Sequence, residues 1–241
     1  MIVLFTDYGL QGPYIGQVEA VLYLHAQDKK VINLIADAPR QNPKASAYLL
    51  AAVTQDFPGG TIFFCVVDPG VGSFKDEPVV MKIDKRWYVG PDNGLFDIVT
   101  RRATQVECWK INWRPQKLSA SFHGRDLYAP VCAMIANGLD IPGEKIEWRN
   151  KHDWPDNLNE IIYIDHFGNC VTGRSAGEVS KETVLKVGKI KVTHANTFSA
   201  VPEGQACWYE NSNGMVEITV NHGRADEVLG LTIGDEIKIS D

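Results

Sequence analysis

The chain has 241 residues and a formal net charge of −6, and its 24 basic side chains show no strong clustering. This length allows one large domain or two modest ones with a substantial core, and scattered basic charge argues against a nucleic-acid-binding surface. No apolar run approaches the roughly 18–20 residues that span a bilayer, and the N-terminus, MIVLFTDYG, lacks the features of a signal peptide. We therefore expect a soluble, cytoplasmic protein without membrane contact. Five cysteines without C-x-x-C spacing are expected to be buried, reduced thiols rather than zinc ligands.

Strand and helix patterns alternate along the first 136 residues. The predicted strands are 2–6, 31–35, 61–67 and the hairpin pair 79–83 and 87–89. Three helices are predicted: one that begins at Pro13, one over 43–57, and one over 127–136 with Asp126 as its N-cap. This order predicts an α/β domain over residues 1–150, with a mainly parallel sheet covered by helices.

The composition changes after residue 140. Residues 140–158 are polar and contain prolines, which predicts a linker. Short strand patterns follow at 160–165, 183–187, 189–192, 205–210, 215–220 and 236–240. Short strands separated by turn signals predict a second domain over 158–241, built as a small β-barrel or sandwich.

Five polar residues each follow an apolar run or lie in a Gly-containing turn. They are Asp7, Asp68, Asp92, His123 and Asp165, in the segments LFTDYG, VVDPGVGS, VGPDNGLF, SFHGRD and IDHFGN. A strand that ends in such a turn is typical of ligand sites in open α/β sheets. Five of them predict that several loops meet at one pocket and that the protein is an enzyme.

Asp7 and Asp68 are the main acidic candidates. A carboxylate at the position of Asp7 is suited to the two hydroxyls of a ribose, with an Asx-turn or helix cap as the structural alternative. Asp68 opens the segment DPGVGS, whose two glycines let the backbone approach a ligand closely. A tight turn with a capping aspartate is the alternative there. The segment is not a P-loop, because Lys-Ser/Thr does not follow at the required spacing.

His123 lies between an aromatic residue and a glycine, just before a predicted helix. A neutral imidazole at this place is able to hold a water molecule or accept its proton, and a structural histidine is the alternative. We interpret Arg125 as a partner in a structural ion pair. The Pro-Asp-Asn-Gly segment that contains Asp92 fits a turn.

The second half of the chain offers further candidates. Asp165 is suited to an ammonium group and Asn169 to the edge of a base, although a β-turn explains this segment nearly as well. The Asn-rich turns at 211–214 and 221–223 flank the predicted strand 215–220 and are weaker candidates.

As an ordered set, TDYG, DPGVGS, GPDNG, FHGRD, IDHFGN and the late segments SNG and VNHGRA resemble the S-adenosyl-L-methionine (SAM) hydroxide adenosyltransferases. These SAM hydrolases are relatives of the SAM-dependent fluorinase and chlorinase. The resemblance implies an N-terminal α/β domain, a C-terminal β-barrel domain, and a homotrimer that binds SAM at its subunit interfaces. It also implies that water converts SAM to adenosine and L-methionine without a metal and without a cofactor, since SAM is the substrate.

The family's water-handling residues are an aspartate, an arginine and a histidine. The first and last match Asp68 and His123, which favours water over halide as the nucleophile. The arginine position falls on Lys75, which keeps the charge but lacks the planar fork of a guanidinium. Arg86 and Arg125 are substitutes that the motif does not align.

The resemblance also implies the substrate contacts. Asp7 is expected at the ribose hydroxyls, Asp165 at the methionine ammonium, Asn169 at the adenine edge, Ser212 at the methionine carboxylate, and the backbone of Asn221 and His222 in the adenine pocket. Gln41 is a departure, because the halogenating relatives carry an aromatic residue there that packs on the ligand.

Two rival functions are compatible with these residues. One is a metal-dependent nucleoside or phosphoester hydrolase that uses Asp7, Asp68, Asp92 and His123 as ligands, although no D-x-D or H-x-x-x-H pair is present. The other is a non-catalytic SAM or adenosine sensor that has lost hydrolysis through the change at Lys75.

Overall fold

The structure is a computed structural model that describes residues 1–73 and 75–240. Residue 241, the end of the predicted second domain, lies outside this range. The chain separates into two compact units, Met1–His152 and Asp153–Asp241. The hydrophobic core that runs from Ile2 to Ala133 lies wholly in the first unit, and the core that runs from Ile161 to Ile237 lies wholly in the second.

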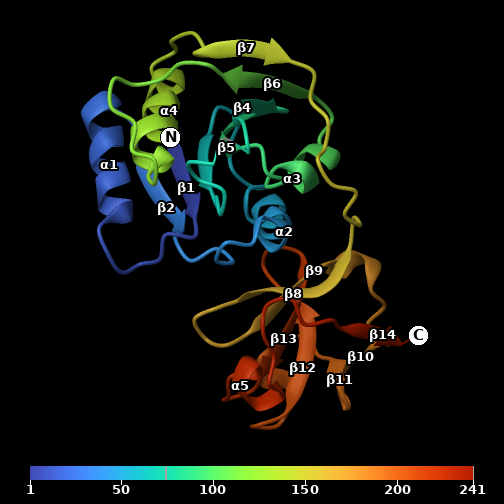
Figure 1. The fold of residues 1–241 in the computed structure, drawn as a ribbon. Coiled ribbons are helices and arrows are strands. Elements are labelled where there is room, and N and C mark those ends of the chain that lie inside the picture. Colours follow the sequence, from blue (N-terminus) through green and yellow to red (C-terminus); the bar gives the residue numbers. More distant parts are fainter. Residues whose placement is uncertain (74, 241) are drawn as a thin grey trace. The chain divides into compact units, whose positions relative to one another are not determined.

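The described part of the first unit forms a seven-stranded sheet in the order β2-β1-β3-β5-β4-β6-β7 (Figure 1). Its strands are β1 (Ile2–Thr6), β2 (Val31–Ile35), β3 (Ile62–Val66), β4 (Pro78–Ile83), β5 (Arg86–Pro91), β6 (Val106–Ile111) and β7 (Gly143–Ile146). Every residue of β1 and β3 is buried, as expected for central strands with covered faces.

The sheet is mixed, which corrects the prediction of a mainly parallel one. The pairs β1–β2, β1–β3 and β3–β5 are parallel, whereas β4 is antiparallel to both β5 and β6, and β6 to β7. Only Asp84 and Lys85 separate β4 from β5. So short a connection permits a hairpin but not the long crossover that parallel strands require.

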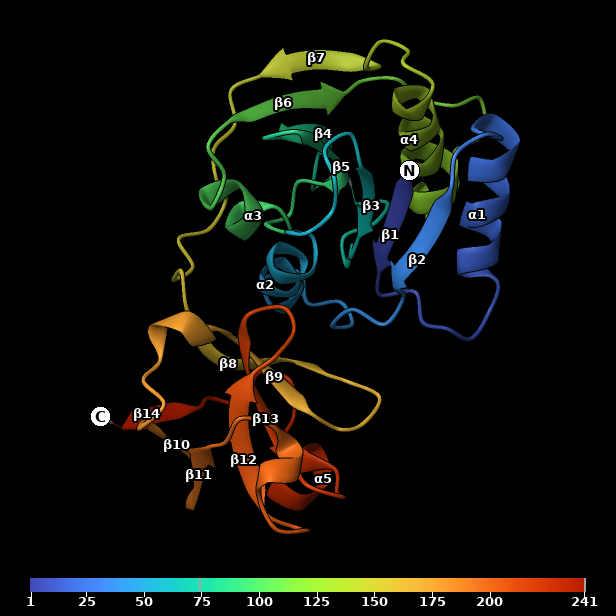
Figure 2. The ribbon, with the colours of Figure 1, turned by 180° about the vertical axis from the view of Figure 1, so that it is seen from behind.

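Helices cover both faces of this sheet. They are α1 (Tyr14–His25), α2 (Pro43–Val53), α3 (Asp97–Arg101) and α4 (Ala129–Ala136). α1 and α4 pack side by side on one face, and α2 and α3 lie on the other (Figures 1 and 2). The start of α2 follows from its sequence, because Pro43 occupies the first turn and the Asn42 side chain accepts a hydrogen bond from the Ala45 amide at 3.0 Å.

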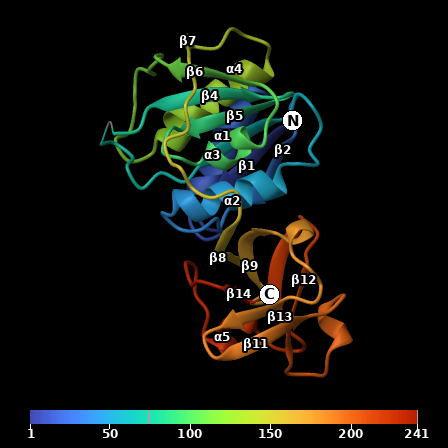
Figure 3. The ribbon, with the colours of Figure 1, turned by 90° about the vertical axis from the view of Figure 1, so that its right-hand side faces the viewer.

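The described part of the second unit forms another seven-stranded sheet, in the order β14-β10-β11-β12-β13-β9-β8. Its strands are β8 (Leu158–Ile164), β9 (Cys170–Ser175), β10 (Val184–Val187), β11 (Ile190–His194), β12 (Ala206–Glu210), β13 (Met215–Val220) and β14 (Lys238–Ser240); its α-helix is α5 (Ala225–Leu229). Figure 3 shows these strands curving around their core.

The two edges of the second sheet approach each other next to β8. An isolated bridge joins Glu160 to Glu236, and Ile237 donates a backbone hydrogen bond of 2.8 Å to the Asn159 carbonyl. The sheet is therefore nearly closed, which is how small β proteins protect exposed strand edges.

Several elements differ from the sequence-based expectation. β6, α3, β9 and α5 were not predicted, and β7 lies inside the segment that was predicted as a linker. The helix expected over 127–136 begins earlier, as a π-helical turn over Gly124–Tyr128 that leads into α4. Asp126 is wrong as an N-cap, because it lies within this turn, where it pairs with Arg125.

Candidate functional site

Two candidate carboxylates lie at one edge of the first sheet. β1 and β3 are parallel neighbours, with Thr6 opposite Val66. Asp7 follows β1 directly, and Asp68 lies two residues beyond the end of β3. Because parallel strands end at the same edge of a sheet, both side chains reach one place. Both line a small cavity of about 60 Å³.

His123 reaches the same cavity from a separate element. It directly precedes the π-helical turn, and single turns of this kind often mark functional sites. His123 and Asp68 line the small cavity and also a larger one of about 420 Å³. The structure therefore brings Asp7, Asp68 and His123 together from three segments that are far apart in the sequence.

Two glycines permit this convergence. Gly72 has a φ of +78°, and a Cβ atom there would clash with the Ala120 carbonyl, so only glycine allows the DPGVGS loop to pack against the segment before His123. A Cβ atom on Gly124 would clash with the hydroxyl of Tyr8. The missing side chain at Gly124 therefore makes room for the tyrosine that follows Asp7.

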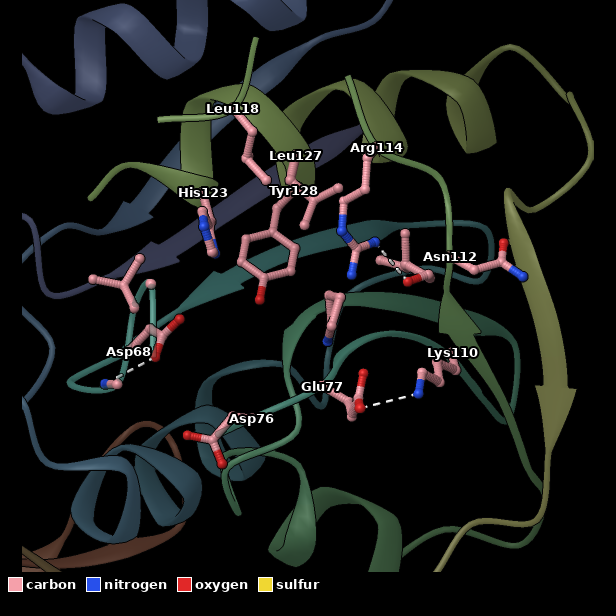
Figure 4. Close-up of a pocket in the computed structure, with 15 residues that line it drawn as sticks. Asp68, Asp76, Glu77, Lys110, Asn112, Arg114, Leu118, His123, Leu127 and Tyr128 are labelled. Atoms are coloured by element: carbon pink, nitrogen blue, oxygen red, sulfur yellow. Dashed lines mark hydrogen bonds and ion pairs between the residues drawn. The ribbon is translucent and has the colours of Figure 1, made fainter. Parts of the chain in front are cut away.

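The larger cavity has a lining of both polar and apolar residues (Figure 4). Its charged and titratable residues are Asp68, Asp76, Glu77, Lys110, Arg114, His123 and Tyr128. Tyr128 lies five residues after His123, at the end of the π-helical turn, and its ring is drawn between His123 and Arg114 (Figure 4). In an α-helix, residues 123 and 127 would share a face, so the sequence pattern did not reveal Tyr128.

Burial sets the charge state of Asp68. Desolvation raises the pKa of its carboxyl to about 6, with smaller contributions in the same direction from Asp76 and Asp7. The Gly70 amide, which donates a hydrogen bond of 3.1 Å to Asp68 Oδ1, partly offsets this rise. Asp68 is therefore able to change its protonation state near neutral pH.

The imidazole of His123 is biased toward its neutral form. Burial lowers its pKa, the positive charge of Arg114 lowers it further, and Asp126 acts in the opposite direction. A neutral imidazole has one nitrogen free to accept a proton. His123 is therefore suited to the role of a base.

The backbone holds Asp7 in place. Its Oδ2 accepts a hydrogen bond of 2.9 Å from the amide of Gln41, a residue with a φ of +53°. Burial raises the pKa of the Asp7 carboxyl, and the Gln41 amide opposes that rise. Gln41 therefore positions the Asp7 carboxylate through its backbone amide, a role that does not depend on its side chain.

The three basic residues considered from the sequence are not among the described residues that line these two cavities. Lys75 is exposed and is not among the described residues that line these two cavities. Arg86 donates to the carbonyls of Phe57 and Gln55. Arg125 pairs with Asp126 through two hydrogen bonds, which confirms its predicted structural ion pair. Arg114, which the motif comparison did not single out, lines the larger cavity instead.

The remaining candidates belong to the second unit. Asp165 accepts hydrogen bonds from the amides of Phe167 and Asn169 and from the Asn169 side chain, all at 2.8–2.9 Å. Asn169 Oδ1 in turn accepts from Thr219 at 2.6 Å. These bonds fit the turn that was the structural alternative for this segment, and the ligand-binding roles of both residues stay predictions.

Ser212, Asn221 and His222 lie in the turns that flank β13. Ser212 is exposed, and Asn221 is buried and donates to the Val201 carbonyl at 2.7 Å. His222 is exposed, with a φ of +56°, so its backbone has a conformation that non-glycine residues seldom adopt. The roles of these three residues in binding also stay predictions.

Residues 1–73 and 75–240 contain no group of three or more His, Cys, Asp or Glu side chains arranged to hold a metal ion. Over the same ranges, no helix combines the length and the apolar composition that a membrane span requires.

Two family models cover most of the chain. Residues 2–144 match the SAM hydroxide adenosyltransferase N-terminal domain, and residues 159–238 match the C-terminal domain of the same name. A protein from Thermus thermophilus named (R)-S-adenosyl-L-methionine hydrolase is 33% identical over 99% of this chain and 98% of its own length. A protein of the same name from Salinispora arenicola is 31% identical over 98% of this chain and 95% of its own.

Solved structures show the same fold. An uncharacterized conserved protein from Thermotoga maritima superposes with a TM-score of 0.90 at 30% sequence identity, and the match covers 100% of both chains. A conserved hypothetical protein from Thermus thermophilus gives a TM-score of 0.78 at 30% identity over 99% of both chains. With matching models for both units, the chain belongs to the SAM hydroxide adenosyltransferase family.

Proposed function

We propose that this protein is a SAM hydrolase, in which water displaces L-methionine from the ribose C5′ of SAM and gives adenosine. Family membership and the name of the relatives at 31–33% identity support this activity. The observation that carries it is the meeting of Asp68 and His123 on a cavity that also contains Asp7. Two residues suited to water thus lie beside one suited to a ribose.

The reaction is a displacement at carbon. A bond forms between the water oxygen and C5′ while the bond from C5′ to sulfur breaks, and the electron pair stays on sulfur. Methionine leaves as a neutral thioether, so its departure needs no acid. The barrier lies in the weakness of water as a nucleophile and in its alignment, which requires an approach opposite sulfur at about 3–3.5 Å.

Asp68 and His123 address both the weak nucleophilicity of water and its alignment. One orients the water and the other accepts its proton as the new bond forms. Positioning is able to lower a barrier by roughly 7–11 kcal/mol, whereas a general base contributes about 10²–10⁴-fold in rate. At 1.36 kcal/mol per factor of ten, that range is about 3–5 kcal/mol. Alignment is therefore the larger contribution.

The substrate contacts follow the family pattern. Asp7 binds the ribose hydroxyls, and its partly buried carboxylate next to the cavity supports this role. In the second unit, the methionine and adenine parts are bound by Asp165, Asn169, Ser212, Asn221 and His222. The predicted contribution of Lys75 to the water site finds no support in the linings of the two cavities, which do not include it.

The proposal extends to the assembled protein. The second unit is a β-barrel domain, which its nearly closed sheet supports. The protein works in the cytoplasm as a homotrimer with sites at subunit interfaces, without a metal or cofactor. Light scattering after size exclusion tests the assembly directly, because a trimer has three times the mass of one chain.

The activity is tested by incubating the protein with SAM after exhaustive chelation. The two sulfonium diastereomers are supplied separately, because the name of the relatives specifies the (R) form. Chromatography should show equimolar adenosine and L-methionine, and His123→Ala should lose most turnover while calorimetry still detects SAM binding. Asp7→Ala should instead weaken SAM binding.

Other outcomes identify the rivals. Activity that chelation removes and a divalent cation restores would indicate a metal-dependent hydrolase. Saturable SAM binding without products would indicate a sensor. A His123→Ala variant that loses binding and turnover equally would place His123 in the substrate site.

A further inference from the structure

The water site needs a positive charge. Asp68 and Asp7 line one small cavity and Asp76 lies on the adjoining one, so several carboxylates act on the same region. A hydroxide-like nucleophile would add more negative charge there. A fixed cation near Asp68 and His123 would stabilise that state and keep the imidazole unprotonated.

Most basic side chains near the site already form hydrogen bonds or ion pairs with other protein groups. Arg86 and Arg125 bond to backbone carbonyls and to Asp126, respectively. Lys110 lines the larger cavity, but its ammonium group pairs with Glu77 at 2.9 Å. Lys151 pairs with Asp76 and Asp92. Lys75 lines neither of the two described cavities.

Arg114 is exposed like Lys75, but it differs from all of these residues in the combination of the cavity that it lines and its partners. It lines the cavity that Asp68 and His123 also line, and Figure 4 shows its guanidinium group directed into that cavity. Its Nη1 donates to the carbonyls of Ile111 at 2.9 Å and Trp113 at 2.8 Å. The group is therefore fixed by its own backbone, and no described carboxylate forms an ion pair with it within 4.0 Å.

We propose that Arg114, rather than Lys75, supplies the positive charge of the water site and acts as a positioning residue for Asp68 and His123. This inference rests on the proposed hydrolase function. A guanidinium stays charged at every working pH, and an anchored one needs little reorganisation during the reaction. Arg114 reaches the site from the segment after β6, so its position in the sequence bears no relation to the DPGVGS motif.

The groups that face His123 determine how its titration responds. Arg114 lowers the pKa of the imidazole, Asp126 raises it, and Asp68 shares both of its cavities. Removing the Arg114 charge should therefore raise the pKa of His123. If the imidazole must be neutral to react, the acidic limb of the rate profile then moves to higher pH.

The test compares Arg114→Met, which keeps most of the side-chain length, with Arg114→Lys, Lys75→Ala and the control Lys117→Ala. Lys117 is exposed, and the Lys117→Ala substitution removes one positive charge from the same segment as Arg114. Arg114→Met should lower kcat by about 100-fold with little change in KM, and move the acidic limb to higher pH. Arg114→Lys should return the acidic limb of the pH–rate profile to its wild-type position and recover part of kcat. Lys75→Ala should cost less than Arg114→Met.

A second readout does not depend on activity. Titration of the histidine ring signals by NMR, with His123 assigned from His123→Gln, should give a higher pKa for His123 in Arg114→Met and an unchanged one in Lys117→Ala. Wild-type protein without SAM hydrolysis would refute the proposed function, while the His123 titration would still test the role of Arg114. An unchanged His123 pKa, or a larger loss in Lys75→Ala than in Arg114→Met, would overturn the inference.

Discussion

Asp68 couples the chemistry of the site to the stability of the fold. Its folded pKa of about 6 lies above the ordinary value of 3.8, so the fold favours the protonated form. The stability that this group contributes is present in acid and is lost as the pH rises through about 6. At neutral pH the Asp68 carboxylate is mostly ionised, and its burial then lowers the stability of the fold, a cost that is common at reactive sites.

The variant Asp68→Asn separates the two effects. It keeps an oxygen for the Gly70 amide but cannot ionise, so we expect it to lose turnover by about 10²–10⁴-fold. Its melting temperature should rise relative to wild type as the pH is increased from about 4 to about 8. Asp28→Asn, at an exposed position, is the control and should show no such trend. A constant difference in melting temperature for Asp68→Asn would mean that Asp68 titrates normally.

The π-helical turn before α4 fixes the geometry around His123. Gly124 starts this turn, and a Cβ atom there would meet the Tyr8 hydroxyl and lie 3.3 Å from the Phe64 ring. Tyr8 packs edge-on against Phe122 with ring centroids 5.6 Å apart. A displacement of Tyr8 would therefore also displace Phe122, the residue before His123.

We expect Gly124→Ala to destabilise the protein by about 1–3 kcal/mol through overpacking and to lower turnover. Gly16→Ala is the matched control, because a Cβ atom on Gly16, in α1, meets nothing within 4 Å. It should stabilise the protein by about 0.5–1 kcal/mol through its helix propensity. Chemical denaturation measures both changes. Equal stability of the two variants would show that the π-helical turn accommodates a Cβ atom at residue 124 without strain.

At the scale of elements, the sequence predicted what local signals encode. β1 and β3 were recognisable as continuous apolar runs, and α2 by the helical spacing of its apolar residues after Pro43. β6 and β9 were missed because they carry charged and small residues among apolar ones. The π-helical turn was also not predicted. It starts at Gly124, where a Cβ atom would meet the Tyr8 hydroxyl, and such a tertiary contact leaves no local sequence pattern.

The whole molecule offers natural probes of its two units. Cys65, Cys108 and Cys132 lie in the first unit, and Cys170 and Cys207 in the second; all five are buried free thiols. Separate cores predict separate unfolding. Under increasing denaturant, thiol labelling followed by mass spectrometry should show two groups of cysteines, each reacting as a set. A single denaturant dependence shared by all five thiols would show that the two units unfold together.

Local patterns were enough to predict the candidate residues Asp7, Asp68 and His123 and the two-part organisation, because strand-end motifs and composition are properties of short stretches of the chain. Tertiary structure decided the antiparallel half of the first sheet, which follows from the short turn at Asp84. It also decided which basic residues line the larger cavity that Asp68 and His123 share. Arg114 and Lys75 are equally plain in the sequence, and only the packing of the segment after β6 distinguishes them.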